Sequence, residues 1–225
     1  GVALALASCA GAADPQVNYA TLRSSMIDAI QAESHQMRGW TGKSELDKRV
    51  IDVMRVVPRH EFVPPPLQPF AYLDRPLPIG HGQTVSQPFL VALMADLAEI
   101  KTGDKVLLIG LGGGYDAAIL EKLAGKIYCL EMEPQVAETA LNHLLRLGHK
   151  NIEVRNDDPY YGWRGAAESF DAIIVRQAMD FVPAALVSQL KPGGRIVIPT
   201  GPSDDGQELT VAYRRNDVRV IERRI

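Results

Sequence analysis

A run of glycines in the middle of the chain is the first feature that could bind a ligand. Gly110, Gly112 and Gly114 follow the apolar run 105–109 and precede a helical pattern. Glycines at such a turn let the backbone approach a ligand closely, and the start of the next helix favours acceptor or negative groups. The spacing lacks the last glycine of the dinucleotide fingerprint, because that position is Tyr115. The motif therefore suits a ligand without phosphates, such as S-adenosylmethionine (SAM); a purely structural turn is the alternative.

Carboxylates stand where two later strands are expected to end. Glu131 closes the apolar run 126–131, and an acid at that place can accept two hydrogen bonds from a ribose diol. Asp157 and Asp158 close the next run, where a carboxylate can accept from an adenine amino group. The structural alternatives are a solvated strand-end acid and a turn pair before Pro159. Together with the glycines, Glu131 and Asp158 predict a nucleoside-binding edge of a sheet.

Alternating strand and helix patterns predict the elements that position these residues. The expected strands are 105–109, 126–131, 152–155, 170–175, 195–199, 208–214 and 217–222. The expected helices are 19–37, 45–57, 87–100, 115–123, 134–147 and 183–190. This alternation predicts an α/β fold with a doubly wound, mostly parallel, seven-stranded sheet. The last two strands alternate like an antiparallel hairpin, which is usual for the SAM-dependent methyltransferase variant of that architecture.

The part of the chain before residue 87 is expected to be a helical lead-in to this sheet. Residues 14–86 are predicted to form two helices and then a proline-rich loop over 58–86, which holds too many prolines for a helix. Residues 87–225 are predicted to be the Rossmann-like domain, and the two parts are expected to be one structural unit. Ser44 and Ser86 are the expected N-caps of the helices that follow them.

The first thirteen residues differ in composition from the rest. Residues 1–13 carry no charge and many small apolar side chains, like the second half of a secretory signal. The sequence Leu6-Ala7-Ser8-Cys9 resembles a bacterial lipobox, in which Cys9 would carry a lipid anchor. The pattern predicts an exported protein, periplasmic or lipid-anchored. The alternatives are an N-terminal extension of another kind and a cytoplasmic protein.

Composition excludes several classes of site and partner. Lys plus Arg is 24 and Asp plus Glu is 27, so a net charge of -3 argues against a nucleic-acid binder. Two cysteines, Cys9 and Cys129, cannot build a disulfide framework, and without a Cys/His cluster no metal site is predicted. Cys129 lies in an apolar run and is expected to be a buried, inert thiol. No segment is apolar enough over about 18 residues to span a membrane. We expect a monomer.

Two segments upstream of the glycines resemble a known family. Residues 57–64 read VPRHEFVP and residues 77–88 read LPIGHGQTVSQP. Both resemble segments of the protein-L-isoaspartate O-methyltransferases, and the second is long, irregular and peculiar to them. The runs 170–175 and 190–195 fit the family's later strands. The chain over 57–214 is therefore identified as similar to this family.

The resemblance implies an enzyme that uses SAM to methylate the free carboxylate of L-isoaspartyl residues, a step in the repair of damaged proteins. It implies that Ser86 hydrogen-bonds the substrate carboxylate and that Gln83 and Thr84 shape the same pocket. The residues implied to bind SAM are Gly110, Gly112, Gly114, Glu131 and Asp158. A carboxylate is already ionised at neutral pH, so the reaction needs alignment of the reacting groups rather than a strong base.

The sequence departs from the family pattern at the cofactor site. The family's first strand usually reads VLEIGTGSG; here it reads VLLIGLGGG, so Leu108 replaces the acid, and Leu111 and Gly113 replace hydroxyl residues. The family's small, alanine-rich turn after the fourth strand is bulkier here and begins with Arg176. One alternative is therefore a family member that binds SAM poorly and acts as a peptide-binding module. A nicotinamide-dependent oxidoreductase is a further alternative, which the glycine spacing disfavours.

Overall fold

The computed structural model describes residues 17–167, 169–202, 206–215 and 220–224. The signal-like segment 1–13, with Cys9, lies outside these residues, so its predicted export or lipid anchor stays a prediction. Among the helices of the described residues, none combines the length and the apolar character that a membrane span requires.

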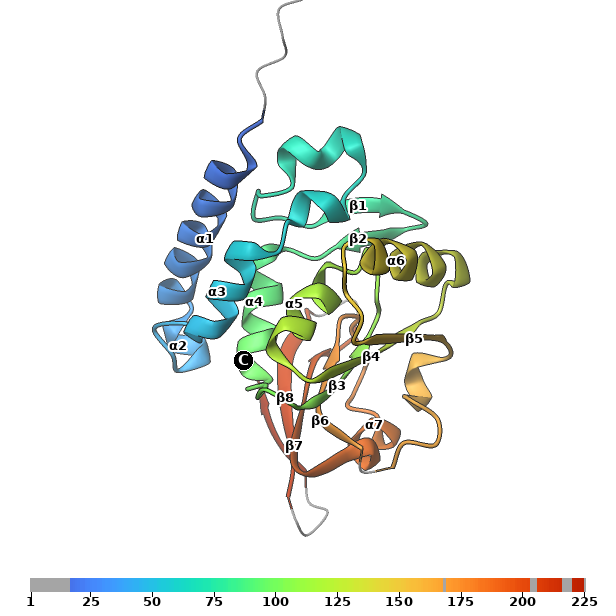
Figure 1. Ribbon diagram of the computed structural model, residues 1–225. Coiled ribbons are helices and arrows are strands. Elements are labelled where there is room, and N and C mark those ends of the chain that lie inside the picture. The colour runs from blue at the N-terminus through green and yellow to red at the C-terminus, as the bar shows by residue number, and fades with distance from the viewer. Residues whose placement is uncertain (1–16, 168, 203–205, 216–219, 225) are drawn as a thin grey trace, which may run out of the picture.

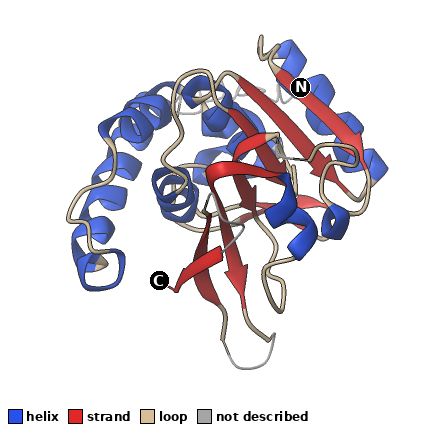
Figure 2. Cartoon of the chain, turned by 90° about the horizontal axis from the view of Figure 1, so that it is seen from below, coloured by secondary structure: helices blue, strands red, loops and turns tan. Residues whose placement is uncertain are grey.

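A seven-stranded sheet with the order β5-β4-β3-β6-β7-β8-β9 forms the centre of the fold (Figure 1). The strands are β3 (Lys105–Ile109), β4 (Lys126–Glu131), β5 (Ile152–Asn156), β6 (Phe170–Val175), β7 (Leu190–Thr200), β8 (Glu208–Arg214) and β9 (Val220–Arg224). In this order, β5, β4, β3, β6 and β7 pair in parallel, whereas the pairs β7–β8 and β8–β9 are antiparallel. The predicted doubly wound α/β sheet with a closing antiparallel hairpin is confirmed, and in Figure 2 the C-terminal end lies beside these closing strands.

The apolar runs become central strands because both faces of the sheet are covered. In β3, Val106 and Leu108 pack in one apolar cluster with the helices of the lead-in, while Leu107 and Ile109 pack in a second cluster on the other face. All four side chains are fully buried. Cys129 of β4 is buried as expected, and burial raises the pKa of its thiol, which agrees with an inert residue.

Seven α-helices occur within the described residues; six lie close to the predicted ranges, and the short helix over residues 38–41 was not predicted. They are α1 (Tyr19–Gln36), α2 (Arg38–Thr41), α3 (Lys48–Val56), α4 (Pro88–Leu97), α5 (Tyr115–Leu123), α6 (Pro134–Arg146) and α7 (Ala184–Gln189).

Both predicted serine N-caps are wrong. The helix α3 begins after Asp47, whose carboxylate accepts from the Arg49 amide at 2.7 Å, so the chain starts the helix three residues later than Ser44 would. The N-cap position of α4 is Gln87, one residue after Ser86. The carboxylate of Asp74, from the preceding loop, accepts from the Phe89 amide at 2.8 Å and takes over the capping role. The hydroxyl of Ser86 is therefore left for another partner.

The segment 58–86 is more regular than its prolines predict. It forms two 3-10 helices, η1 (Arg59–Phe62) and η2 (Pro65–Phe70), and then an antiparallel hairpin of β1 (Leu77–Gly80) and β2 (Gln83–Val85). Prolines fit the first turn of a 3-10 helix, because the backbone N–H groups there donate no hydrogen bonds within the helix. The hairpin lies next to α6 at the top of Figure 1.

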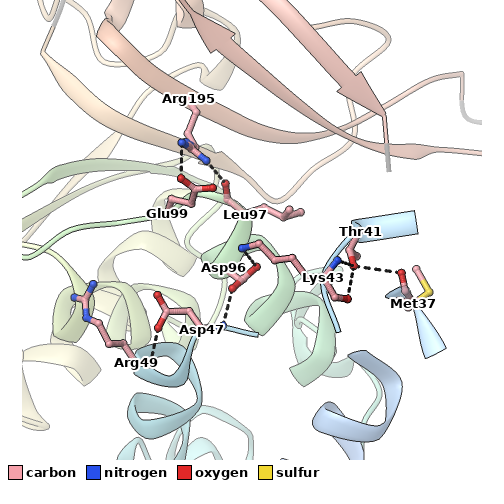
Figure 3. Close-up of polar contacts among 9 residues, drawn as sticks. All are labelled: Met37, Thr41, Lys43, Asp47, Arg49, Asp96, Leu97, Glu99 and Arg195. Atoms are coloured by element: carbon pink, nitrogen blue, oxygen red, sulfur yellow. Dashed lines mark hydrogen bonds and ion pairs between the residues drawn. The ribbon is translucent and has the colours of Figure 1, made fainter. Parts of the chain in front are cut away.

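Polar contacts dock the lead-in onto the sheet domain (Figure 3). Asp96 of α4 is 2% exposed, and its carboxylate accepts from the Lys43 ammonium at 2.8 Å and from the Asp47 amide at 2.7 Å. At the end of α4, Glu99 pairs with Arg195 of β7 at 2.7 Å. The helix α4 thus joins the N-terminal helices to the sheet.

Candidate active site

Four chemically distinct segments meet at one edge of the sheet. The strands β3, β4, β5 and β6 are parallel, so their carboxyl ends lie on the same side. They lead directly to Gly110, Glu131, Asp158 and Arg176. The chain moves outward from β3 to β5 and then returns to place β6 beside β3. Such a reversal is the usual ligand position in an open α/β sheet.

The glycines of the loop after β3 have different tasks. Gly110, Gly112 and Gly114 all have positive φ, at 89°, 52° and 90°, a region that other residues rarely adopt. A Cβ on Gly112 would lie 2.4 Å from Nη1 of Arg176, whereas a Cβ on Gly114 would lie 3.1 Å from Leu144 of α6. Gly112 thus faces the strand-end edge, and Gly114 allows α5 and α6 to pack closely.

Glu131 holds the glycine loop in place. Its side chain is buried, and its Oε2 accepts from the amides of Leu111 and Gly112, both at 3.0 Å. Its Oε1 accepts from the Glu133 amide at 3.2 Å. A carboxylate offers about four lone-pair sites, two on each oxygen, so one site remains on Oε1 for a further donor such as a ribose hydroxyl.

Asp158 is also used by the fold. Its carboxylate accepts from the Tyr160 amide at 2.9 Å and so caps the short turn Pro159–Tyr161, as the structural alternative expects. The neighbouring Asp157 pairs with Arg164 at 3.0 Å. Asp158 remains exposed at the edge, open to a ligand.

Two arginines fix Ser86 from opposite ends. Nη2 of Arg59 donates to the Ser86 carbonyl at 2.6 Å, and Arg176 donates to the Ser86 hydroxyl from Nη2 at 2.9 Å and from Nε at 3.2 Å. Thr84 joins the site through its carbonyl, which accepts from Nη2 of Arg176 at 2.9 Å, while its side chain is exposed. Gln83 lies in β2, half-buried, and the described residues give its side chain no polar contact with this site.

A cavity of about 370 Å³ lies on the side of the glycine loop that faces α6. It is lined by residues 61–65, by Ile79 and His81 of the hairpin region, by Gly112 and Gly113, and by α6. Neither Glu131 nor Asp158 lines it, so this cavity and the strand-end acids are separate features. Within the described ranges, no group of His, Cys, Asp and Glu could hold a metal ion.

Besides Arg176, three side chains of the site were not assigned a role from the sequence. Asp116 of α5 pairs with Arg176 at 3.3 Å, and both side chains are 9% exposed. Arg59 and Asp74 hold the two sides of the Ser86 segment, as described above. The position of Asp116, an acid inside the apolar stretch of α5, could have pointed to a role for it. The position of Arg59 within the family segment 57–64 could have done the same for that residue. For Asp74 the sequence gives no signal.

The carboxylate of Asp74 also faces a second acid, Glu33 of α1. Burial, together with a hydrogen bond to Asp74 and the charge of Asp74, raises the pKa of Glu33 from 4.5 to about 7. The folded protein therefore binds a proton that the unfolded chain releases between these two pH values. This proton stabilises the fold at low pH, and its contribution is lost as the pH rises through about 7.

We predict that Glu33→Gln removes this pH dependence, because glutamine donates to Asp74 without a proton that can be lost. The variant should be more stable than the wild type at pH 8 and nearly equal to it at pH 5. Urea unfolding at both pH values measures the difference, with the exposed acid Glu138 replaced by glutamine as the matched control. Parallel stability profiles for wild type and Glu33→Gln would contradict the prediction.

Comparisons with known proteins agree with this geometry. The family model described as protein-L-isoaspartate(D-aspartate) O-methyltransferase matches residues 37–225. A relative from Polaromonas sp. named protein-L-isoaspartate O-methyltransferase 2 is 46% identical over 89% of this chain and 94% of its own length. One of the same name from Syntrophobacter fumaroxidans is 42% identical over 100% of this chain and 90% of its own.

Solved structures show the same fold. A protein-L-isoaspartate O-methyltransferase matches 90% of this chain with a TM-score of 0.76 and 25% identity. This chain spans 63% of the length of that protein. A candidate enzyme of this kind from Plasmodium falciparum, in complex with S-adenosyl-L-homocysteine, matches 92% of this chain and 94% of its own, with a TM-score of 0.67 and 23% identity.

Proposed function

The chain belongs to the protein-L-isoaspartate(D-aspartate) O-methyltransferase family, and on this premise we propose which residues carry out the reaction. It is a SAM-dependent enzyme that methylates the free carboxylate of L-isoaspartyl residues in damaged proteins. The shared name of the relatives favours this enzyme over a peptide-binding module and over an oxidoreductase. The observation that carries the residue assignment is the hydroxyl of Ser86, held at the strand-end edge by Arg176.

The residues at this edge fit SAM. Acceptors follow two adjacent strands, at Glu131 and Asp158, and a glycine loop follows a third. Glu131 keeps one lone-pair site, on Oε1, for a ribose hydroxyl. Asp158 follows the adjacent strand and is exposed for the adenine amino group. When bound, SAM supplies a methyl group that its sulfonium has already activated. Gly110 and Gly112 then let the backbone approach, while Gly114 serves helix packing.

Ser86 would bind the substrate carboxylate. Its hydroxyl accepts from a guanidinium, which can only donate, so its own proton is free to point toward a carboxylate oxygen. The carboxylate is ionised at neutral pH, and the reaction therefore needs no base from the protein. The role of Ser86 is to fix the attacking oxygen in line with the methyl group, which is how orientation contributes to rate. The carbonyl of Thr84 helps to fix the same loop.

We predict that Ser86→Ala lowers turnover of an isoaspartyl peptide roughly tenfold to a hundredfold. This corresponds to the loss of one hydrogen bond to a charged group, about 1.5–3 kcal/mol. The affinity for SAM should stay within about twofold, because the cofactor residues lie elsewhere. Turnover is measured with a synthetic isoaspartyl peptide, and SAM affinity by calorimetry.

Ser188→Ala is the matched control, since Ser188 is exposed on α7 and its hydroxyl donates to the Ala185 carbonyl of the same helix. Equal losses of turnover and of SAM affinity in Ser86→Ala would mean that Ser86 acts by supporting the whole site. Unchanged turnover would remove it from the mechanism.

We also propose, from the N-terminal sequence alone, that the protein is exported through the signal-like segment 1–13, with Cys9 as the lipid attachment point. Its partners would be proteins that contain isoaspartyl residues, and the enzyme would act as a monomer.

A further inference from the structure

We propose that Arg176 is a positioning residue that makes the active site selective for an anionic substrate group. It would hold the Ser86 hydroxyl as a donor and add positive charge beside the carboxylate that this hydroxyl binds. The proposal rests on the proposed role of Ser86.

Arg176 connects the hairpin side of the site with the glycine loop and with α5. Its guanidinium donates to the Ser86 hydroxyl and to the Thr84 carbonyl on the hairpin side, and from Nη1 to the Gly110 carbonyl at 2.9 Å. Its Nε lies 3.3 Å from Oδ1 of Asp116. The side chain is 9% exposed, so these contacts lie in a largely desolvated place. Such a place strengthens charge-assisted hydrogen bonds.

The chemistry of a guanidinium determines the direction of the Ser86 hydroxyl. Arginine has five N–H donors and no acceptor, so the oxygen of Ser86 must accept from Arg176. Among the described residues the hydroxyl proton has no acceptor of its own. Ser86 therefore offers a donor to whatever lies next to it, and a carboxylate is the natural acceptor.

Charge adds to this preference. The contacts of Arg176 with Ser86, Thr84 and Gly110 are all to neutral oxygens, and Asp116 is its one anionic partner within the described residues. A carboxylate bound to the Ser86 hydroxyl would lie within two hydrogen bonds of the guanidinium. A neutral carboxamide of the same shape would gain the Ser86 bond but much less from the charge.

The packing at Gly112 shows that the glycine loop accommodates the guanidinium of Arg176. A Cβ on Gly112 would lie 2.4 Å from Nη1 of Arg176 and 3.2 Å from the Thr84 carbonyl oxygen. The absence of a side chain at Gly112 thus leaves room for the guanidinium, and the arginine is a packed part of the site rather than a surface residue.

The test compares two synthetic peptides that differ only at one group: an isoaspartyl peptide with a carboxylate, and its isoasparaginyl counterpart with a neutral carboxamide. Calorimetry measures the binding of each to the full chain with S-adenosyl-L-homocysteine present, which prevents turnover. The wild type should bind the carboxylate peptide at least about tenfold more tightly. Arg176→Met should weaken the carboxylate peptide roughly tenfold to a hundredfold and the carboxamide peptide less than about threefold.

Arg176→Lys keeps the charge with fewer donors and should recover part of the carboxylate preference. Arg38→Met, an exposed arginine of α2, should leave both affinities unchanged. Equal weakening of both peptides by Arg176→Met would overturn the proposal, because a merely structural tie has no reason to distinguish them. A wild type without preference would overturn it as well.

The two proposals fail in different ways. If the wild type binds the carboxylate peptide selectively but transfers no methyl group to it, the proposed reaction is wrong while the role of Arg176 stands. If methyl transfer occurs and Arg176→Met keeps the full carboxylate preference, the reaction stands and the role of Arg176 is wrong.

Discussion

Replacing Glu131 with alanine is expected to lower the free energy of unfolding by about 3 kcal/mol and to lower the SAM affinity at least about tenfold. The carboxylate accepts from three backbone amides, those of Leu111, Gly112 and Glu133, and is 2% exposed. Alanine leaves these donors without their acceptor in a place that water reaches poorly. Each buried, unpaired donor costs roughly 1–3 kcal/mol, and partial hydration of the new space limits the sum.

Glu131→Gln separates the structural task from the ligand task. Its amide oxygen can still accept from the Leu111 and Gly112 amides, so the loss of stability should be about 1 kcal/mol. The affinity for SAM should fall nearly as far as in the alanine variant, because one acceptor for the ribose diol has become a donor. Urea unfolding and SAM calorimetry give the two quantities, and the neighbouring Glu133→Gln is the matched control.

Full SAM affinity in Glu131→Gln would show that the carboxylate only holds the loop. An unchanged free energy of unfolding in Glu131→Ala would show that the three hydrogen bonds from backbone amides make no net contribution to stability.

The sequence predicts the sheet well because its strands are specified locally. The runs 126–131 and 170–175 became β4 and β6 with the predicted bounds, since an unbroken apolar run between turn signals has few other ways to be buried. The ends of such parallel strands share one edge. The contact of the glycine loop with Glu131 therefore followed from the order of the elements alone.

Contacts between distant residues could not be predicted in this way. The cap of α4 comes from Asp74, fifteen residues before the amide it binds, so the nearest serine was the wrong choice. The pair of Asp116 and Arg176 joins α5 to the end of β6, and a single sequence carries no sign of that pairing. The sequence identified Arg176 only as a departure from the family pattern and did not indicate what it does.

The prediction of an irregular loop over 58–86 was incomplete for a related reason. Its prolines exclude a long helix, and this part of the prediction was right. The strands β1 and β2 have four and three residues, too few for an alternating pattern to be evident. A buried side chain at the start of the segment, Arg59 of η1, bonds to the carbonyls of Ala71 and Ser86 and so ties its later part to its beginning.

Arg59 is fully buried and bonds mainly to backbone carbonyls. Its Nε donates to the Ala71 carbonyl at 2.7 Å, its Nη2 to the Ser86 carbonyl at 2.6 Å, and its guanidinium lies 4.8 Å from the centre of the Tyr115 ring. Burial lowers the pKa of Arg59, while Tyr115 and Asp116 act in the opposite direction. Replacing a buried ion pair by apolar side chains is often harmless. Here, however, the partners are carbonyl groups that no substitution at Arg59 removes.

We therefore predict that Arg59→Met lowers the free energy of unfolding by about 3–5 kcal/mol, because the Ala71 and Ser86 carbonyls lose their donors and the Tyr115 ring loses its cation. Arg59→Lys should lose less, since one ammonium can still reach one carbonyl. Arg55→Met, an exposed arginine of α3, is the control and should change stability by less than about 0.5 kcal/mol. Urea unfolding measures all three variants.

Hydrogen exchange shows where the effect of Arg59→Met lies. Because the bonds of Arg59 end at both sides of the segment 71–86, the amides of β1 and β2 should lose protection before those of β3 and β4 in the remaining folded protein. Turnover should then fall even where the protein is still folded, since the Ser86 carbonyl no longer has the donor that fixes this residue on the side opposite Arg176. A loss of stability below about 1 kcal/mol, or an equal loss of protection across the whole sheet, would show that the Ser86 segment is ordered by its other contacts.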